Sequence, residues 1–114
     1  MRAFDIAQLV AQTGPGQVTW LEFLRVPALS LGLYRLPAGA TDPQEPHSED
    51  EVYYVLRGRS RFRAGAEDRE VQPGTVLFIE AGVEHRFHSI KEDLQLLVVF
   101  APAENSLRPA SEPR

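Results

Sequence analysis

The sequence predicts an all-β fold, an antiparallel sandwich or barrel, and two observations carry that prediction. Short apolar segments recur from residue 17 to residue 100, separated by Gly, Pro and acidic turns. Segments of this length and spacing are typical of antiparallel sandwiches and barrels rather than of alternating βα units. The chain has 114 residues, 43% of them hydrophobic and 25% charged, which fits one globular domain with one core.

Each element follows from the pattern of its own segment. Residues 4–11 have a loose amphipathic pattern, so a short N-terminal helix is expected before the break at Gly14-Pro15-Gly16. Residues 18–26 are rich in β-forming residues, and in residues 29–34 every second position is leucine, which favours a strand with one buried side. Further strands are predicted at residues 51–56, 60–64, 70–71, 76–79, 85–88 and 94–100.

These elements divide the chain into three parts. Residues 1–16 form an N-terminal extension with the short helix, and residues 17–101 form the β-domain. Residues 102–114 contain three of the nine prolines and few apolar residues, which predicts a flexible C-terminal tail.

Composition and missing motifs exclude several function classes. The net charge of −4 argues against a general nucleic-acid binder. The longest apolar run, residues 96–101, is too short to span a membrane, and no secretory pattern begins the chain, so a cytoplasmic location is expected. No cysteine is present, and we find no phosphate-binding loop, dinucleotide motif or serine-nucleophile motif.

Metal-type ligands are distributed unevenly along the chain. Glu45, His47 and Glu51 precede one predicted strand closely, and His85 begins a distant one. Side chains two residues apart share a face in extended chain, so a barrel that directs all four inward brings two imidazoles and two carboxylates together. Such donors bind a divalent first-row metal at about 2.0–2.2 Å. The competing interpretation is that the acidic run 49–51 is a solvated edge and that the histidines are ordinary hydrogen-bonded residues.

Two separated segments resemble the motifs of the cupin superfamily. Gly39, Glu45, His47, Glu51 and Gly58 fall in the register of G-x5-H-x-H-x3-E-x6-G, and Gly74, Gly82 and His85 in that of G-x5-P-x-G-x2-H-x3-N. The resemblance implies a small antiparallel double-stranded β-helix, or jelly-roll barrel, with a metal held inside by His47, Glu51 and His85.

The chain departs from that pattern at three positions. Glu45 replaces the first motif histidine, Glu80 the proline and Ser89 the asparagine. Glu45 as a ligand makes the site more anionic and favours Fe(II), Mn(II) or Ni(II) over Zn(II), although Zn(II) stays among the candidates. Alternatively, Glu45 points away and leaves Gln44 or water in its place. Glu45 and Tyr53 are also the candidate catalytic residues.

Several functions are compatible with this site. The first is a metal-binding cupin with a small-molecule pocket; if it is an enzyme, the resemblance favours a metal-dependent dioxygenase, and an isomerase or decarboxylase would use the metal as a Lewis acid. The alternatives are a non-catalytic module that binds a small ligand or a metal, and a structural cupin that mediates assembly. A homodimer is expected, because the family usually dimerises and residues 96–100 are apolar on both faces.

Overall fold

The computed structural model describes residues 1–108, in which one short helix and eight strands occur. The predicted elements are confirmed, with ends that move by at most three residues. In chain order they are α1 (Ile6–Ala11), β1 (Thr19–Val26), β2 (Leu29–Leu36), β3 (Asp50–Arg57), β4 (Ser60–Ala64), β5 (Glu67–Val71), β6 (Val76–Ile79), β7 (His85–His88) and β8 (Leu94–Ala101).

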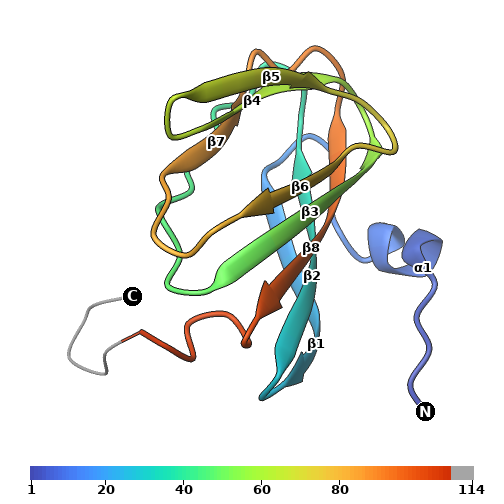
Figure 1. Cartoon of the computed structure of the whole chain (residues 1–114). Coiled ribbons are helices and arrows are strands. Elements are labelled where there is room, and N and C mark those ends of the chain that lie inside the picture. The colour runs from blue at the N-terminus through green and yellow to red at the C-terminus, as the bar shows by residue number, and fades with distance from the viewer. Residues whose placement is uncertain (109–114) are drawn as a thin grey trace.

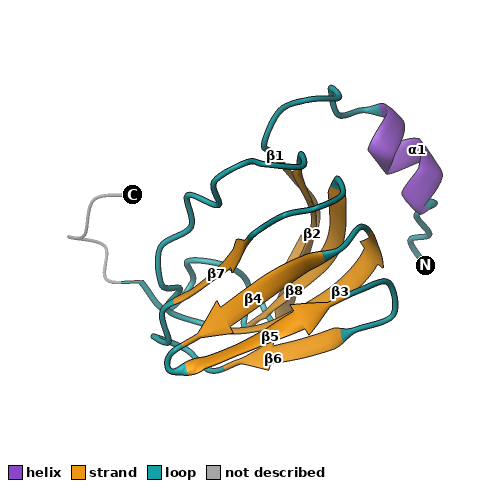
Figure 2. Ribbon diagram, turned by 90° about the horizontal axis from the view of Figure 1, so that it is seen from above, coloured by secondary structure: helices purple, strands orange, loops and turns teal. Residues whose placement is uncertain are grey.

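Antiparallel pairing builds two sheets that pack against each other, with α1 on the outside (Figures 1 and 2). The larger sheet has the order β1-β2-β8-β3-β6 and the smaller one the order β5-β4-β7. The last strand, β8, lies between β2 and β3, with Leu33 opposite Leu97 and Tyr53 opposite Val98. This arrangement of strands distant in sequence is a jelly-roll barrel, so the predicted fold class is confirmed.

The core lies between the two sheets and is held by aromatic side chains from both. Tyr53 on β3, Phe62 on β4 and Phe87 on β7 have ring centroids 4.6 to 5.7 Å apart. Leu96 and Val98 on β8 complete this cluster and are fully buried. Each large apolar side chain buried in this way contributes about 1.5–3 kcal/mol, which keeps the strands that carry the polar groups in fixed positions.

The turn before β5 is tighter than the sequence predicts. β5 begins at Glu67 rather than at residue 70, because Gly65 has a φ of +57° and Ala64 pairs directly with Glu67. A glycine in the left-handed region allows this two-residue hairpin connection.

Residues 102–108, the described part of the predicted tail, fold back against the barrel. Ala103 is buried, and its N–H donates to the Pro27 carbonyl at 3.4 Å. Residues 109–114, the rest of the predicted tail, lie outside the described residues. Within residues 1–108, no helix combines the length and apolarity needed to cross a membrane.

The turn between β3 and β4 depends on glycine for two reasons. Gly58 has a φ of +96°, and a Cβ there would lie 2.3 Å from the Asp93 carbonyl oxygen. We expect Gly58→Ala to lower the free energy of unfolding by more than about 2 kcal/mol, because a backbone clash adds to the left-handed strain of about 1–2 kcal/mol. Urea unfolding measures the change.

Gly74→Ala is the matched control. Gly74 has a similar φ of +93°, but nothing lies within 4 Å of its added Cβ. The free energy of unfolding of Gly74→Ala should therefore fall only by the left-handed strain. Equal decreases in the two variants would contradict the role of the Asp93 contact.

Candidate metal centre

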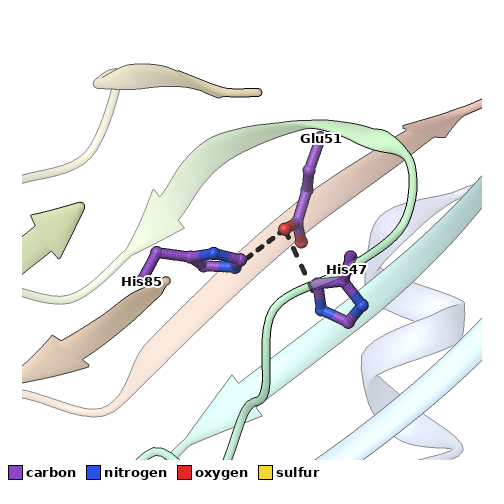
Figure 3. A group of neighbouring side chains, drawn as sticks. All are labelled: His47, Glu51 and His85. Atoms are coloured by element: carbon purple, nitrogen blue, oxygen red, sulfur yellow. Dashed lines mark ion pairs between the residues drawn. The ribbon is translucent and has the colours of Figure 1, made fainter. Parts of the chain in front are cut away.

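Three of the four predicted ligands meet at one end of the barrel interior. His47 lies in the connection before β3, Glu51 is the second residue of β3, and His85 begins β7. One ligand atom from each lies within 4.8 Å of the others (Figure 3). Glu51 Oε1 is 2.9 Å from His85 Nε2 and 4.0 Å from His47 Nε2. Both imidazoles therefore direct Nε2 toward one carboxylate.

The Glu51 carboxylate is buried without hydrogen bonds of its own. Its side chain is 1% exposed, and neither oxygen accepts a hydrogen bond of good geometry from a described residue. The 2.9 Å approach of His85 Nε2 brings the two groups together as an ion pair but does not have hydrogen-bond geometry. Burying a carboxylate in this state is costly unless a cation compensates it, so the donor set fits a divalent metal.

The two histidines have different surroundings. His85 Nδ1 lies 2.9 Å from the Val83 carbonyl, which needs a donor, so Nδ1 carries a proton and Nε2 faces the centre. Burial lowers the pKa of His85, but the contacts with Glu51 and Val83 outweigh it and raise that pKa above its ordinary value. Burial lowers the pKa of His47, which keeps its imidazole neutral and able to bind a metal near pH 7.

A hydrogen-bond network that sequence reasoning missed fixes a fourth donor beside the three residues. Gln44 Nε2 donates to Asp42 Oδ2 at 2.8 Å, so its Oε1 faces the centre, 3.4 Å from His47 Nε2. The Tyr53 hydroxyl donates to the same Oε1 at 2.7 Å and lies 3.2 Å from His85 Nε2. Burial and the Glu51 charge raise the pKa of Tyr53 well above its ordinary value, so its hydroxyl stays protonated.

Asp42 organises this network although no motif marks it. It is 2% exposed and accepts hydrogen bonds from the Tyr34 hydroxyl at 2.7 Å and from the Phe87 N–H at 2.9 Å, besides Gln44. It thus ties the connection after β2 to both sheets. The one sequence signal is the position of Asp42 before Pro43, which is typical of a turn but not of a buried acid that accepts several hydrogen bonds.

The structure does not bring Glu45 to the other three predicted ligands. Glu45 is exposed and lies on the outer side of His47, in a hollow that it shares with Pro46 and Ser48. Gln44, the alternative at this position, points inward instead. The expected shared face of residues 45 and 47 fails because the connection before β3 is not a regular strand, and Gln44 and His47, three residues apart, both face the centre.

A second unpredicted residue, Glu104, reaches the centre from the folded-back C-terminal segment. Its Oε2 lies 3.6 Å from His47 Nδ1, on the side of the ring away from Glu51, and its side chain is 16% exposed. Burial, together with the charges of Glu22 and Glu51, raises the pKa of Glu104 to about 7. The proline content of its segment gave no sign of this placement.

A cavity of about 170 Å³ opens onto the centre. Trp20, Tyr34 and Phe100 form its aromatic wall, and His47, Glu51 and Glu104 lie at its polar end. Gly32 leaves the space that the Trp20 indole occupies, since a Cβ at residue 32 would lie 2.0 Å from that ring. A larger hollow of about 270 Å³ lies on the outer face of β4 and β5 and includes none of the site residues.

Comparison with known proteins identifies the family. A family model described as "Cupin domain" matches residues 32–100, which hold both motifs and all three clustered residues. An uncharacterized protein of Streptomyces coelicolor is 47% identical over 105 residues, which is 92% of this chain and 100% of that protein. This chain therefore belongs to the cupin family.

Solved structures agree with that assignment. The crystal structure of TT1209 from Thermus thermophilus matches with a TM-score of 0.78 and 30% identity, over 90% of this chain and 99% of that one. A conserved Klebsiella pneumoniae protein with a double-stranded β-helix domain matches with a TM-score of 0.75 and 17% identity, over 90% of each chain. The second match shows the fold alone, and the barrel described above is that double-stranded β-helix.

The raised pKa of Glu104 predicts how stability depends on pH. Its value of about 7 in the folded protein, against an ordinary 4.5, means that folding favours the neutral acid. That contribution is complete below pH 4.5 and is lost as the pH rises through 7, where a tenfold change in a proton affinity corresponds to about 1.4 kcal/mol. Metal-free protein should therefore lose stability relative to Glu104→Gln between pH 5 and pH 8. Urea unfolding of both proteins at the two pH values tests this, and a pH-independent difference would contradict it.

Proposed function

We propose that this protein binds one divalent transition metal through His47 Nε2, Glu51 and His85 Nε2. The observation that carries the proposal is the buried Glu51 carboxylate, which has two imidazoles directed at it and no hydrogen bond to satisfy it. A cation supplies the missing compensation. Gln44 Oε1 stands beside the three residues as a neutral oxygen donor.

The donor set favours Fe(II). Two histidines and one carboxylate with open positions beside them are typical of non-haem Fe(II) oxygenases, and Mn(II) or Ni(II) suits the same donors. When bound, Fe(II) would supply the activation of O2 for the oxidation of an organic substrate. We therefore propose a dioxygenase-like oxidoreductase, with a non-catalytic binding module as the alternative.

The residues around the centre have roles in this proposal that the chain itself supports. The aromatic wall of Trp20, Tyr34 and Phe100 would bind the apolar body of a small substrate and exclude water. This hollow of about 170 Å³ would take about one ring of that substrate, since engineered cavities of about 150 Å³ bind benzene. Tyr53 is fully buried, and the hydrogen bond from its hydroxyl would hold the Gln44 oxygen at the centre.

Metal binding is tested by comparing single-histidine variants. We expect the purified chain to bind one Fe(II) or Co(II) ion, and His47→Ala and His85→Ala to lose that binding, because each removes a ligand. His88→Ala is the matched control, since His88 pairs with Asp68 at 2.9 Å on the outer side of the small sheet. Metal analysis after dialysis and calorimetric titration give the stoichiometry and affinity.

The pH dependence of the metal affinity gives a second test in the same titration. The contact with Glu51 raises the pKa of His85, so protons compete with the metal for its Nε2 and the affinity should fall as the pH falls. Equal metal contents in the parent and both site variants would refute the proposed centre.

Oxygen uptake then separates an enzyme from a binding module. The Fe(II)-loaded parent is mixed with catechols, flavonols, thiols or keto acids in an oxygen electrode, with His47→Ala as the blank. Uptake above the blank supports the dioxygenase, and metal binding without uptake across the panel favours the binding module.

We also propose that two copies associate through the outer face of the larger sheet. Tyr54 on β3 and Val76 and Phe78 on β6 are 43%, 64% and 62% exposed and are neighbours across the β3–β6 pairing. Leu97 and Val99 on β8 continue this apolar face and are half-buried. A second copy that covers the face would bury these side chains, as the doubly apolar β8 sequence requires.

Charge on this face should prevent the association. Phe78→Glu is expected to convert a dimer into a monomer in sedimentation and light-scattering measurements at micromolar concentration. Leu107→Glu, at a residue that is 60% exposed elsewhere, is the matched control and should stay dimeric. A monomeric parent protein would refute the proposed interface.

A further inference from the structure

The C-terminal segment 102–108 is fastened to the barrel by a buried carboxylate. Glu49 is 1% exposed, and its two oxygens accept the backbone N–H groups of Asn105 at 2.7 Å and of Leu107 at 2.9 Å. The Ser48 hydroxyl donates to the same carboxylate. Charge-assisted bonds of this kind are strong, and Glu49 lies only two residues from both His47 and Glu51.

Further contacts fix the part of the segment that carries Glu104. The Glu104 N–H donates to the hydroxyl of Ser30, a fully buried residue of β2, at 2.9 Å. The Arg25 guanidinium donates to the Glu104 carbonyl at 2.9 Å and pairs with Glu22 at 2.7 Å. The backbone of Glu104 is therefore held from both strands of the β1–β2 hairpin.

These anchors place the Glu104 side chain at one nitrogen of His47 while Glu51 lies at the other. Glu104 Oε2 is 3.6 Å from Nδ1, and Glu51 Oε1 is 4.0 Å from Nε2. His47 lies in a connection rather than in a strand, so β-sheet pairing does not orient its ring. Its ring packs at 4.7 Å against Phe100, and Gln44 Oε1 lies 3.4 Å from Nε2 as an acceptor, which favours a proton on Nε2 in the metal-free protein and which Glu104 opposes at Nδ1.

We propose that Glu104 is a positioning residue for His47: it favours the tautomer with the proton on Nδ1 and so turns the Nε2 lone pair toward the metal. This proposal rests on the proposed metal centre. An imidazole ligand commonly donates its other N–H to a carboxylate or carbonyl, and losing such a partner weakens metal binding about 10–100-fold. His85 has the Val83 carbonyl in this role at 2.9 Å, and Glu104, at an ion-pair distance of 3.6 Å, is the corresponding acceptor beside His47 Nδ1.

The affinity for Co(II) alone tests the proposal at pH 8, with quenching of Trp20, the single tryptophan, as the signal. We expect Glu104→Ala to bind Co(II) about 10–100-fold more weakly than the parent. Glu92→Gln is the charge-matched control, because Glu92 is exposed and pairs with Arg59 in the turn before β4. It should bind like the parent.

The position of the proton on the His47 ring is a second measurement, and loss of packing alone would not change it. The chain has three histidines, so long-range 15N–1H spectra assign each ring directly. In the metal-free protein at pH 8, Gln44 Oε1 at Nε2 and Glu104 at Nδ1 compete for the His47 proton, so Glu104→Ala should shift His47 toward the Nε2-protonated form relative to the parent, while His85 is unchanged.

Glu49→Gln tests the route by which the segment acts. Loss of the Glu49 hydrogen bonds to the C-terminal segment should weaken Co(II) binding in the parent background. It should add little in the Glu104→Ala background, since both changes remove the same contact. Additive losses of Co(II) affinity would overturn the role of Glu49.

The outcomes separate the two claims. A parent that binds no Co(II) refutes the proposed metal centre itself. A parent that binds Co(II), beside a folded Glu104→Ala of equal affinity and unchanged His47 tautomer, refutes only the role of Glu104.

Discussion

The account of this protein depends on one carboxylate that is buried without hydrogen bonds. Three acids are almost fully buried in the described barrel: Asp42, Glu49 and Glu51. Asp42 and Glu49 each accept several hydrogen bonds, and bonds from Ser48, Leu107 and Asn105 lower the pKa of Glu49 although burial opposes them. Glu51 accepts none from the described residues and faces two imidazoles instead. The fold thus satisfies two acids with hydrogen bonds and leaves the third facing two imidazoles, where the proposed metal would compensate it.

The two satisfied acids build the surroundings of the third. Asp42 directs the Gln44 oxygen toward the centre, and Glu49 holds the C-terminal segment that brings Glu104 to His47. The strands of the barrel supply only Glu51 and His85 directly. The connections and the C-terminal segment supply the rest, so a rigid barrel carries a centre whose finer geometry is set by hydrogen bonds outside the sheets.

Much of this was predictable from the sequence, for physical reasons that particular residues illustrate. Strand periodicity and turn glycines fix the barrel, and the spacing of His47, Glu51 and His85 within two motifs predicts that they converge. The acidic run 49–51 is ambiguous in the sequence, because only alternation along the chain at the start of β3 separates buried Glu49 and Glu51 from exposed Asp50. The choice between Glu45 and Gln44 depends on the partner of the Gln44 amide, Asp42, which local sequence does not reveal.

Glu104 and the aromatic wall of the cavity lay beyond sequence reasoning for a similar reason. Both arise from contacts between distant segments, namely β2 with the C-terminal segment and Trp20 on β1 with Phe100 on β8.

X-ray absorption at the metal edge of the Fe(II)-loaded chain tests the central claim most directly. It should show two imidazoles and oxygen donors at about 2.0–2.2 Å. A spectrum with no imidazole scattering would contradict it.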